Sequence, residues 1–301
     1  MVFEPNSSVA AARAPARVAL VTCSRFSDLD SDDQLLIQPL AELGVIAEPA
    51  VWDDPAVDWA AYRLAVLRSP WDYTPRRAEF LSWARSVPRL ANPAELITWN
   101  TDKRYLAELA ARGVATVETS WVAPGDAWTP GERGEIVIKP TVGAGSFGAG
   151  RYDLAIPEHR RLAAEHVARF GAAGRPLMIQ PYLSGVDTEG ETALIFIAGR
   201  YSHAIRKGAM LTGPQRDVPG LYLAEQISTR QPDPAQLLVA ERVLGIVSAD
   251  YGQPLYARVD LLPGADGAPV LVELELTEPS LFLSTEPGAA SAFAAAIALG
   301  L

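Results

Sequence analysis

The chain has 301 residues, of which 49% are hydrophobic and 21% are charged, and this composition excludes a disordered or fibrous protein. A chain of this length is too long for one ordinary compact core and fits two or three small domains. The formal net charge is −10. This balance excludes a general nucleic-acid binder and a binder of acidic membranes, because no surplus of basic residues is left to neutralise phosphates.

No run of apolar residues reaches the length of about 18 that a membrane-spanning helix needs. Residues 1–16 lack the basic start and the apolar core of a signal peptide, and we expect them to form a flexible arm. The single cysteine, Cys23, excludes an intramolecular disulfide and a cysteine-based zinc site. We therefore expect a cytoplasmic protein, with a homodimer as the default assembly because it is the commonest one.

The segment 17–98 alternates apolar runs with helical patterns, which predicts a parallel βαβ domain. Loops that follow the carboxyl ends of such strands are the usual ligand-binding positions. Arg68, Ser69 and Asp72 lie at such a point and are candidate substrate ligands, with a capped turn and a local ion pair as the alternative. The predicted strands are 17–23, 45–51 and 64–68, and the predicted helices are 32–44 and 80–85.

The rest of the chain mixes strands and helices less regularly. A loop at 206–223 contains glycine and proline and is a candidate mobile lid. The predicted strands are 136–140, 151–154, 177–180, 191–197, 201–207, 255–262 and 270–276. The predicted helices are 101–112, 157–170, 234–249 and 289–299.

A glycine-rich loop, residues 141–150 (TVGAGSFGAG), joins two predicted strands. Glycines allow the backbone to approach phosphates closely, and successive N–H groups form an anion-binding nest. A Rossmann fingerprint would need a helix directly after the loop, a P-loop would end in G-K-[ST], and a protein kinase carries its lysine on a later strand. Here a strand follows and Lys139 precedes the loop. The pattern predicts a hairpin flap over phosphates, with a flexible hairpin as the alternative.

The basic residues comprise 23 arginines and only three lysines, Lys103, Lys139 and Lys207. Lysines that persist in such a composition are candidates for positions that need a compact ammonium group rather than a planar guanidinium. Chance retention at the surface is the alternative.

Two predicted strands near the C-terminus carry charged residues that share a face, because side chains alternate along a strand. These are Arg258 with Asp260, and Glu273 with Glu275. Acidic residues are depleted in strands and rarely buried without a partner or a metal ion. Three neighbouring carboxylates with a phosphate site nearby predict Mg²⁺, and Arg258 is placed to stabilise a transferring phosphoryl group. The alternative is a solvent-exposed salt bridge between Arg258 and one glutamate.

The order and spacing of these features over residues 17–300 resemble the glutathione-synthetase-like branch of the ATP-grasp superfamily. The resemblance implies an α/β fold in which an N-terminal parallel βαβ domain, 17–98, precedes two α+β subdomains that clamp ATP. These would be a central lid subdomain at 99–183 and a C-terminal subdomain at 184–301 that carries the metal site.

The resemblance also implies roles for individual residues. Lys103 and Lys139 would hold the α- and β-phosphates under a flap containing Gly145 and Ser146, and Lys207 would contact phosphate or substrate. The adenosine would meet Gln180, Tyr182, Leu183 and Asp187, the last at the ribose hydroxyls. Asp260 and Glu273 match the magnesium-bridging pair. Glu275 stands where the family usually has asparagine, which leaves the number of magnesium ions open.

By the same resemblance the reaction is an ADP-forming ligation, in which a carboxylate takes the γ-phosphate and a nitrogen then displaces it from the acylphosphate. The strings 67–73 (LRSPWDY), 99–103 (WNTDK) and 275–281 (ELTEPSL) are similar to a bacterial subgroup. That subgroup includes a ligase that closes O-ureido-D-serine into the ring of D-cycloserine.

This similarity implies a small amino-acid-like substrate and an intramolecular attack. Ser280 would lie by the substrate carboxylate, and Arg68, Ser69 and Asp72 would hold its amino-acid end. The alternatives are an intermolecular ligase of the glutathione synthetase or D-Ala-D-Ala ligase kind, and a phosphotransferase on the same scaffold.

Overall fold

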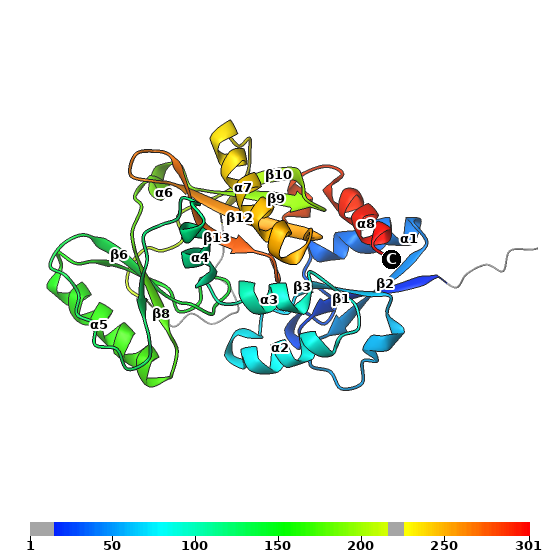
Figure 1. The fold of residues 1–301 in the computed structure, drawn as a ribbon, viewed down its shortest axis with the longest axis horizontal. Coiled ribbons are helices and arrows are strands. Elements are labelled where there is room, and N and C mark those ends of the chain that lie inside the picture. The colour runs from blue at the N-terminus through cyan, green and yellow to red at the C-terminus, as the bar shows by residue number, and fades with distance from the viewer. Residues whose placement is uncertain (1–14, 216–225) are drawn as a thin grey trace, which may run out of the picture.

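The computed structural model describes residues 15–215 and 226–301, and its three sheets are distinct in Figure 1. Nearly all of the expected flexible arm, and residues 216–223 of the expected lid, lie outside the described residues. Ala16, which we placed in the arm, already begins the first strand. In the described part of the chain no helix combines the length and the apolarity needed to cross a bilayer.

The first sheet is parallel, as the sequence predicts, with strand order β2-β1-β3-β4. Its helices are α1 (Ile37–Glu42) and α2 (Arg77–Ser86). The predicted helix at 32–44 begins as a 3₁₀ turn, Asp33–Leu36, and ends at Gly44, whose φ of 74° suits glycine. The strands are β1 (Ala16–Thr22), β2 (Val45–Val51), β3 (Leu64–Ser69) and β4 (Leu90–Ala91).

Two short helices, α3 (Ala94–Asn100) and α4 (Tyr105–Ala111), connect the first sheet to the second. The sequence predicted one helix from residue 101, and the structure corrects this. Lys103 lies in the turn between the two helices, because its backbone N–H donates to the Thr141 carbonyl at 2.8 Å instead of to a carbonyl one helical turn back.

The second sheet is antiparallel, with strand order β5-β8-β6-β7. Its helix α5 (Pro157–Ala172) covers one face and contributes Ala163, Val167 and Phe170 to a local apolar core (Figure 1). The hairpin of β6 and β7 carries the glycine-rich loop at its turn, which confirms that the loop joins two paired strands. The strands are β5 (Ser120–Val122), β6 (Glu135–Pro140), β7 (Gly150–Asp153) and β8 (Leu177–Pro181).

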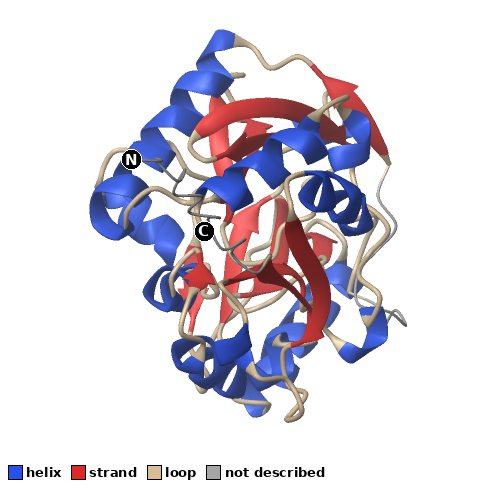
Figure 2. Cartoon of the chain, turned by 90° about the vertical axis from the view of Figure 1, so that its right-hand side faces the viewer, coloured by secondary structure: helices blue, strands red, loops and turns tan. Residues whose placement is uncertain are grey.

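The third sheet is also antiparallel, with order β11-β10-β9-β12-β13. Its inner strands are β10 (Arg200–Lys207), β9 (Glu191–Ile197) and β12 (Tyr256–Pro263), and its edge strands are β11 (Ile227–Arg230) and β13 (Pro269–Glu275). Figure 2 shows helices on the outer sides of the sheets. The helices of this part are α6 (Gly185–Thr188), α7 (Pro234–Tyr251) and α8 (Ala289–Leu299).

One hydrophobic core joins the beginning and the end of the chain. It contains Val18 and Leu20 of β1, Ile195 of β9 and Phe293 of α8, all fully buried. The last helix packs against α1 and closes the first sheet, as the neighbouring blue and red ribbons of Figure 1 show. Each sheet comes from one predicted segment, but this core crosses the predicted boundaries, so the division into domains stays a prediction.

Candidate active site

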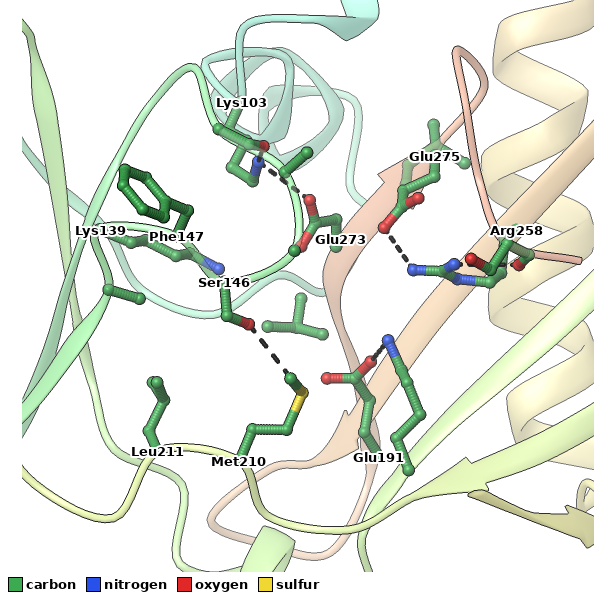
Figure 3. A pocket seen from close by; sticks show the side chains of 18 of the residues that line it. Lys103, Lys139, Ser146, Phe147, Glu191, Met210, Leu211, Arg258, Glu273 and Glu275 are labelled. Atoms are coloured by element: carbon green, nitrogen blue, oxygen red, sulfur yellow. Dashed lines mark hydrogen bonds and ion pairs between the residues drawn. The ribbon is translucent and has the colours of Figure 1, made fainter. Parts of the chain in front are cut away.

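A cavity of about 430 Å³ lies where the three parts of the chain meet. Trp71 and Tyr73 line it from the first part, Lys139 and the glycine-rich flap from the second, and Glu273 from the third. Figure 3 shows that basic and acidic side chains from different elements point into the same space. The cavity is therefore a shared site that no single sheet could form.

Two of the three lysines, Lys103 and Lys139, lie near Glu273 on the same side of this cavity (Figure 3). Lys103 Nζ donates to the Gly143 carbonyl at 2.6 Å and pairs with Glu273 at 3.0 Å. Burial opposes the charge of Lys103, but Glu273 and neighbouring carboxylates raise its pKa. Burial lowers the pKa of Lys139, which forms no ion pair within residues 15–215 and 226–301. Lys139 is thus the ammonium group most open to an incoming anion.

The flap over the cavity owes its turn to left-handed backbone. Gly145 and Ser146 have φ values of 57° and 59°, a region that glycine occupies at little cost. Ser146 Oγ lies 3.9 Å from the sulfur of Met210, so the flap touches the segment that follows β10 (Figure 3). Gly145 and Ser146 both line the cavity, which brings them to the same space as the two lysines.

A buried charge network forms the floor behind these groups. Asp260 accepts from Lys207 at 2.7 Å and from Arg258 at 2.9 Å, and it is 1% exposed. Arg258 also pairs with Glu275, and Lys207 pairs with Glu191. Burial opposes ionisation of Asp260, but the two cations hold its pKa well below its usual range. The strands β12 and β13 are neighbours, and their register sets Arg258 opposite Glu275 and Asp260 opposite Glu273.

Two of the three carboxylates expected to hold magnesium line the cavity. Asp260 faces its two cationic partners and does not line the cavity, whereas Glu273 and Glu275 do. Within the described ranges no group of three or more His, Cys, Asp or Glu side chains is placed to hold an ion. The three carboxylates are instead ion-paired with Lys207, Arg258 and Lys103. The role of Asp260 as a metal ligand stays a prediction.

The pKa values of the carboxyl groups in the cavity shift in different directions because their neighbours differ. Burial raises the pKa of Glu191 to about 7, although Lys207 opposes the shift. Burial also raises the pKa of Glu275 against the opposing effect of Arg258. Burial alone would raise the pKa of Glu273, but Lys103 and Lys139 lower it overall. Glu273 is therefore the ionised oxygen donor beside the two lysines, which is the kind of ligand that Mg²⁺ prefers.

The end of β8 contributes the residues predicted to meet adenosine. Gln180, Tyr182 and Leu183 line the cavity, and Asp187 does not. Asp187 instead accepts from the Tyr182 hydroxyl at 2.5 Å and pairs with Arg151 at 3.4 Å. The Arg151 guanidinium lies 3.5 Å from the centre of the Tyr182 ring. Through its hydrogen bond, Asp187 holds Tyr182, a residue of the cavity lining, in place.

The candidate substrate ligands are not brought together. Ser280 lines the cavity, but Arg68, Ser69 and Asp72 do not. Arg68 is fully buried, pairs with Asp33 at 2.8 Å and donates to the Pro279 carbonyl at 2.7 Å. Ser69 shares a hydrogen bond with the hydroxyl of Thr22, and Asp72 accepts from Trp52 and pairs with Arg76. These contacts match the alternative of a turn held by local ion pairs, and their role toward substrate stays a prediction.

Several residues of the cavity were not predicted from the sequence. Glu191 faces Lys207 across β9 and β10, and a hairpin turning at residues 198–199 places these two opposite one another, which is a signal the sequence contained. Glu278 and Tyr73 line the cavity and are almost buried. Asp30 and Asp32 reach it from the loop after β1, where the sequence offered no distinguishing pattern.

The architecture is that of the ATP-grasp ligases. An ATP-grasp RimK domain protein from Sphaerobacter thermophilus matches with a TM-score of 0.64 and 20% identity over 95% of this chain and 99% of that one. D-alanine–D-alanine ligase from Bacillus anthracis, solved with ATP, matches with a TM-score of 0.62 and 14% identity over 94% of this chain and 96% of that one. These two matches show that the chain has the ATP-grasp fold.

More similar proteins define the family within that class. A family model described as the N-terminal domain of D-cycloserine synthetase DcsG matches residues 18–92. The cycloserine biosynthesis protein DcsG of Streptomyces lavendulae is 41% identical over 298 residues, which cover 93% of this chain and 97% of that protein. A crystal structure of D-cycloserine synthetase DcsG matches with a TM-score of 0.83 and 40% identity over 94% of this chain and 99% of that one. The chain belongs to the DcsG family.

Proposed function

We propose that this enzyme closes O-ureido-D-serine into the ring of D-cycloserine and converts ATP to ADP and phosphate in doing so. The observation that carries the proposal is the cavity in which Lys103, Lys139 and the glycine flap meet Glu273 and Arg258. This set of ammonium groups, flap N–H groups and a guanidinium can bind a nucleoside triphosphate and stabilise the charge that develops during phosphoryl transfer. The similarity to cycloserine biosynthesis proteins supports the choice of substrate.

In this proposal ATP binds between the second and third sheets. Lys139, which has no described ion-pair partner, binds a phosphate directly. Lys103, whose Nζ donates to the Gly143 carbonyl, binds the same phosphate. Gln180, Tyr182 and Leu183 contact the adenine, and Gly145 and Ser146 cover the phosphates. Asp187 exchanges its hydrogen bond with the Tyr182 hydroxyl for hydrogen bonds with the ribose hydroxyls. The lid would then be the segment 99–183.

Magnesium fits the cavity because Glu273 and Glu275 offer carboxylate oxygens beside the phosphate-facing lysines. Mg²⁺ usually binds through one or two protein carboxylates together with the phosphates of the nucleotide. These two residues would hold it, with Asp260 behind them. When bound, the ion offsets negative charge on the transferring phosphoryl group.

The reaction begins when the substrate carboxylate attacks the γ-phosphorus, and the bond from that phosphorus to the β-phosphate oxygen breaks. Arg258 and Lys207 line the cavity where charge accumulates. The ureido nitrogen bonded to oxygen then attacks the acylphosphate carbon and phosphate leaves. Because D-cycloserine lacks the carbamoyl group on that nitrogen, water must afterwards release this group. Exclusion of water from the cavity at this step would protect the acylphosphate from hydrolysis.

Incubation of the protein with ATP, magnesium and O-ureido-D-serine tests the proposal. We expect ADP, free phosphate and D-cycloserine in equal amounts, measured by mass spectrometry. A product that retains phosphate would show a phosphotransferase, a linear product joined to an added amine would show an intermolecular ligase, and release of AMP would contradict the reaction altogether. A homodimer and a cytoplasmic location stay predictions, for which sedimentation and cell fractionation are the measurements.

A further inference from the structure

The loop that follows β13 is held by its backbone at three consecutive residues. Trp71 Nε1 donates to the Glu278 carbonyl at 3.0 Å, Arg68 donates to the Pro279 carbonyl at 2.7 Å, and Arg258 donates to the Ser280 carbonyl at 3.0 Å. The donors come from β3, the loop after it, and β12. Hydrogen bonds from charged donors are stronger than neutral ones. The backbone at Glu278 is therefore held by donors from two parts of the chain at once.

Glu278 lines the cavity, although the residue is only 8% exposed. Glu191, Glu273 and Glu275 in the same cavity are ion-paired, whereas Glu278 forms no ion pair with any residue in the described ranges. Tyr73, which also lines the cavity and is 3% exposed, lowers the pKa of this carboxyl. Glu278 is thus a buried acidic residue of the cavity lining that forms no ion pair within the described ranges.

The surroundings of this carboxyl leave it able to exchange a proton near neutral pH. Burial raises the pKa of Glu278 to about 7; the hydrogen bond from Tyr73 and the charges of Lys103 and Arg258 oppose the rise, and Glu273 adds to it. A proton acceptor works best when its pKa is close to the working pH. The cavity offers no histidine for this task, because His159, His166 and His203 are all absent from its lining.

The ring-closing step needs a proton acceptor. A ureido nitrogen shares its lone pair with the neighbouring carbonyl and attacks poorly while it keeps its proton. The same carbonyl and the attached oxygen make that proton comparatively acidic, so a carboxylate can remove it as the new bond forms.

We propose that Glu278 is the catalytic base of the ring-closing step, an inference that rests on the proposed function. The nitrogen–carbon bond forms as the N–H proton passes to the Glu278 carboxylate. The carbon–oxygen bond to phosphate breaks, and phosphate leaves with that electron pair. Glu278 then returns its proton to water. Tyr73 donates to the carboxylate and orients it toward the nitrogen, and the three held carbonyls keep it there.

The variant Glu278→Gln tests this assignment because it keeps the size of the side chain and removes the base. Formation of the acylphosphate does not need Glu278, so ADP release should continue when hydroxylamine is added to trap the acylphosphate as a hydroxamate. Hydroxylamine is a strong enough nucleophile to react without a base. We expect cyclised product, with or without its carbamoyl group, to form about 10²- to 10⁴-fold more slowly. Glu241→Gln, on an exposed residue of α7, is the matched control.

A second variant tests the same idea independently of how Glu278→Gln folds. Tyr73→Phe removes the donor that lowers the pKa of Glu278. The acidic limb of the pH profile for ring closure should therefore move to higher pH, while the pH profile of hydroxamate formation stays in place.

The results distinguish a failure of Glu278 as the base from a failure of the proposed function. Loss of cyclised product with hydroxamate retained, or the shift in Tyr73→Phe, supports Glu278 as the base. Equal loss of both products in Glu278→Gln together with an unshifted limb in Tyr73→Phe would overturn it, as would unchanged ring closure. Wild-type protein that yields no cyclised product would refute the proposed function and this inference with it, whereas the other outcomes leave the proposed function intact.

Discussion

Arg68 offers the sharpest test of how this structure holds together, because the sequence and the structure suggest different roles for it. Its guanidinium is fully buried, pairs with Asp33 and also binds the Pro279 carbonyl. Burial raises the pKa of Asp33 even though Arg68 opposes the shift. Replacing Arg68 by methionine would leave a buried carboxyl and a carbonyl without their partner.

Removing one member of a buried ion pair costs about 3–5 kcal/mol, since the remaining charge is left uncompensated in a poorly polarisable interior. We expect Arg68→Met to lower the free energy of unfolding by that amount, measured by urea denaturation with an unchanged m value. The double variant Arg68→Met/Asp33→Leu removes both charges and should recover at least half of the loss. As a control, Arg112→Ala breaks the exposed pair with Asp250 and should cost less than about 1 kcal/mol.

A loss below about 1 kcal/mol in Arg68→Met would refute this reasoning. The same holds if stability is unchanged and only the KM for the amino-acid substrate rises. That second result would restore Arg68 as the substrate contact that the sequence suggested.

Three other predictions follow from the site and from the second sheet. Lys139→Ala should weaken ATP binding by about tenfold or more without changing the circular dichroism spectrum, because a charged hydrogen-bond donor contributes about 1.5–3 kcal/mol; calorimetric titration measures this. Glu273→Gln should abolish ADP release while keeping the fold, and near-normal turnover would contradict the site. Burial lowers the pKa of His166 from 6.5 to about 4, so the unfolded chain binds the extra proton between these values. Stability should therefore fall as the pH drops from 6.5 to 4, by about 3 kcal/mol at most, and His166→Phe should flatten this dependence in denaturant titrations.

Much of the fold could be predicted because local patterns decide it. The strand Glu191–Ile197 and the helix Ala289–Leu299 have the predicted bounds, since apolar runs and small helix-forming residues leave little ambiguity there. The three scarce lysines all line one cavity, as their scarcity suggested. The turn at Lys103 was missed because a contact with Thr141, far along the chain, replaces the helical hydrogen bond.

The direction of side chains in buried strands could not be predicted. All six residues of β3 are buried, so its sequence shows no alternation that would tell which face Arg68 occupies. The same holds for Asp260, because the residues around it in β12 are all buried and their sequence shows no alternation either. Glu278 follows a strand in an irregular loop, where its position depends on donors from Arg68, Trp71 and Arg258. Such long-range contacts leave no periodic trace in the sequence.

The core shared by β1 and α8 has a consequence for how the protein is made. During synthesis, the ribosome releases the first sheet long before Phe293 and Ile297 emerge to cover it. Until then Val18 and Leu20 lack the partners that bury them, and the nascent chain must hold this sheet in an incomplete state. A shortened gene product that ends before α8 would consequently lose the first sheet as well as the last helix. The two ends of the polypeptide thus form a single cooperative folding unit, although most of the chain separates them.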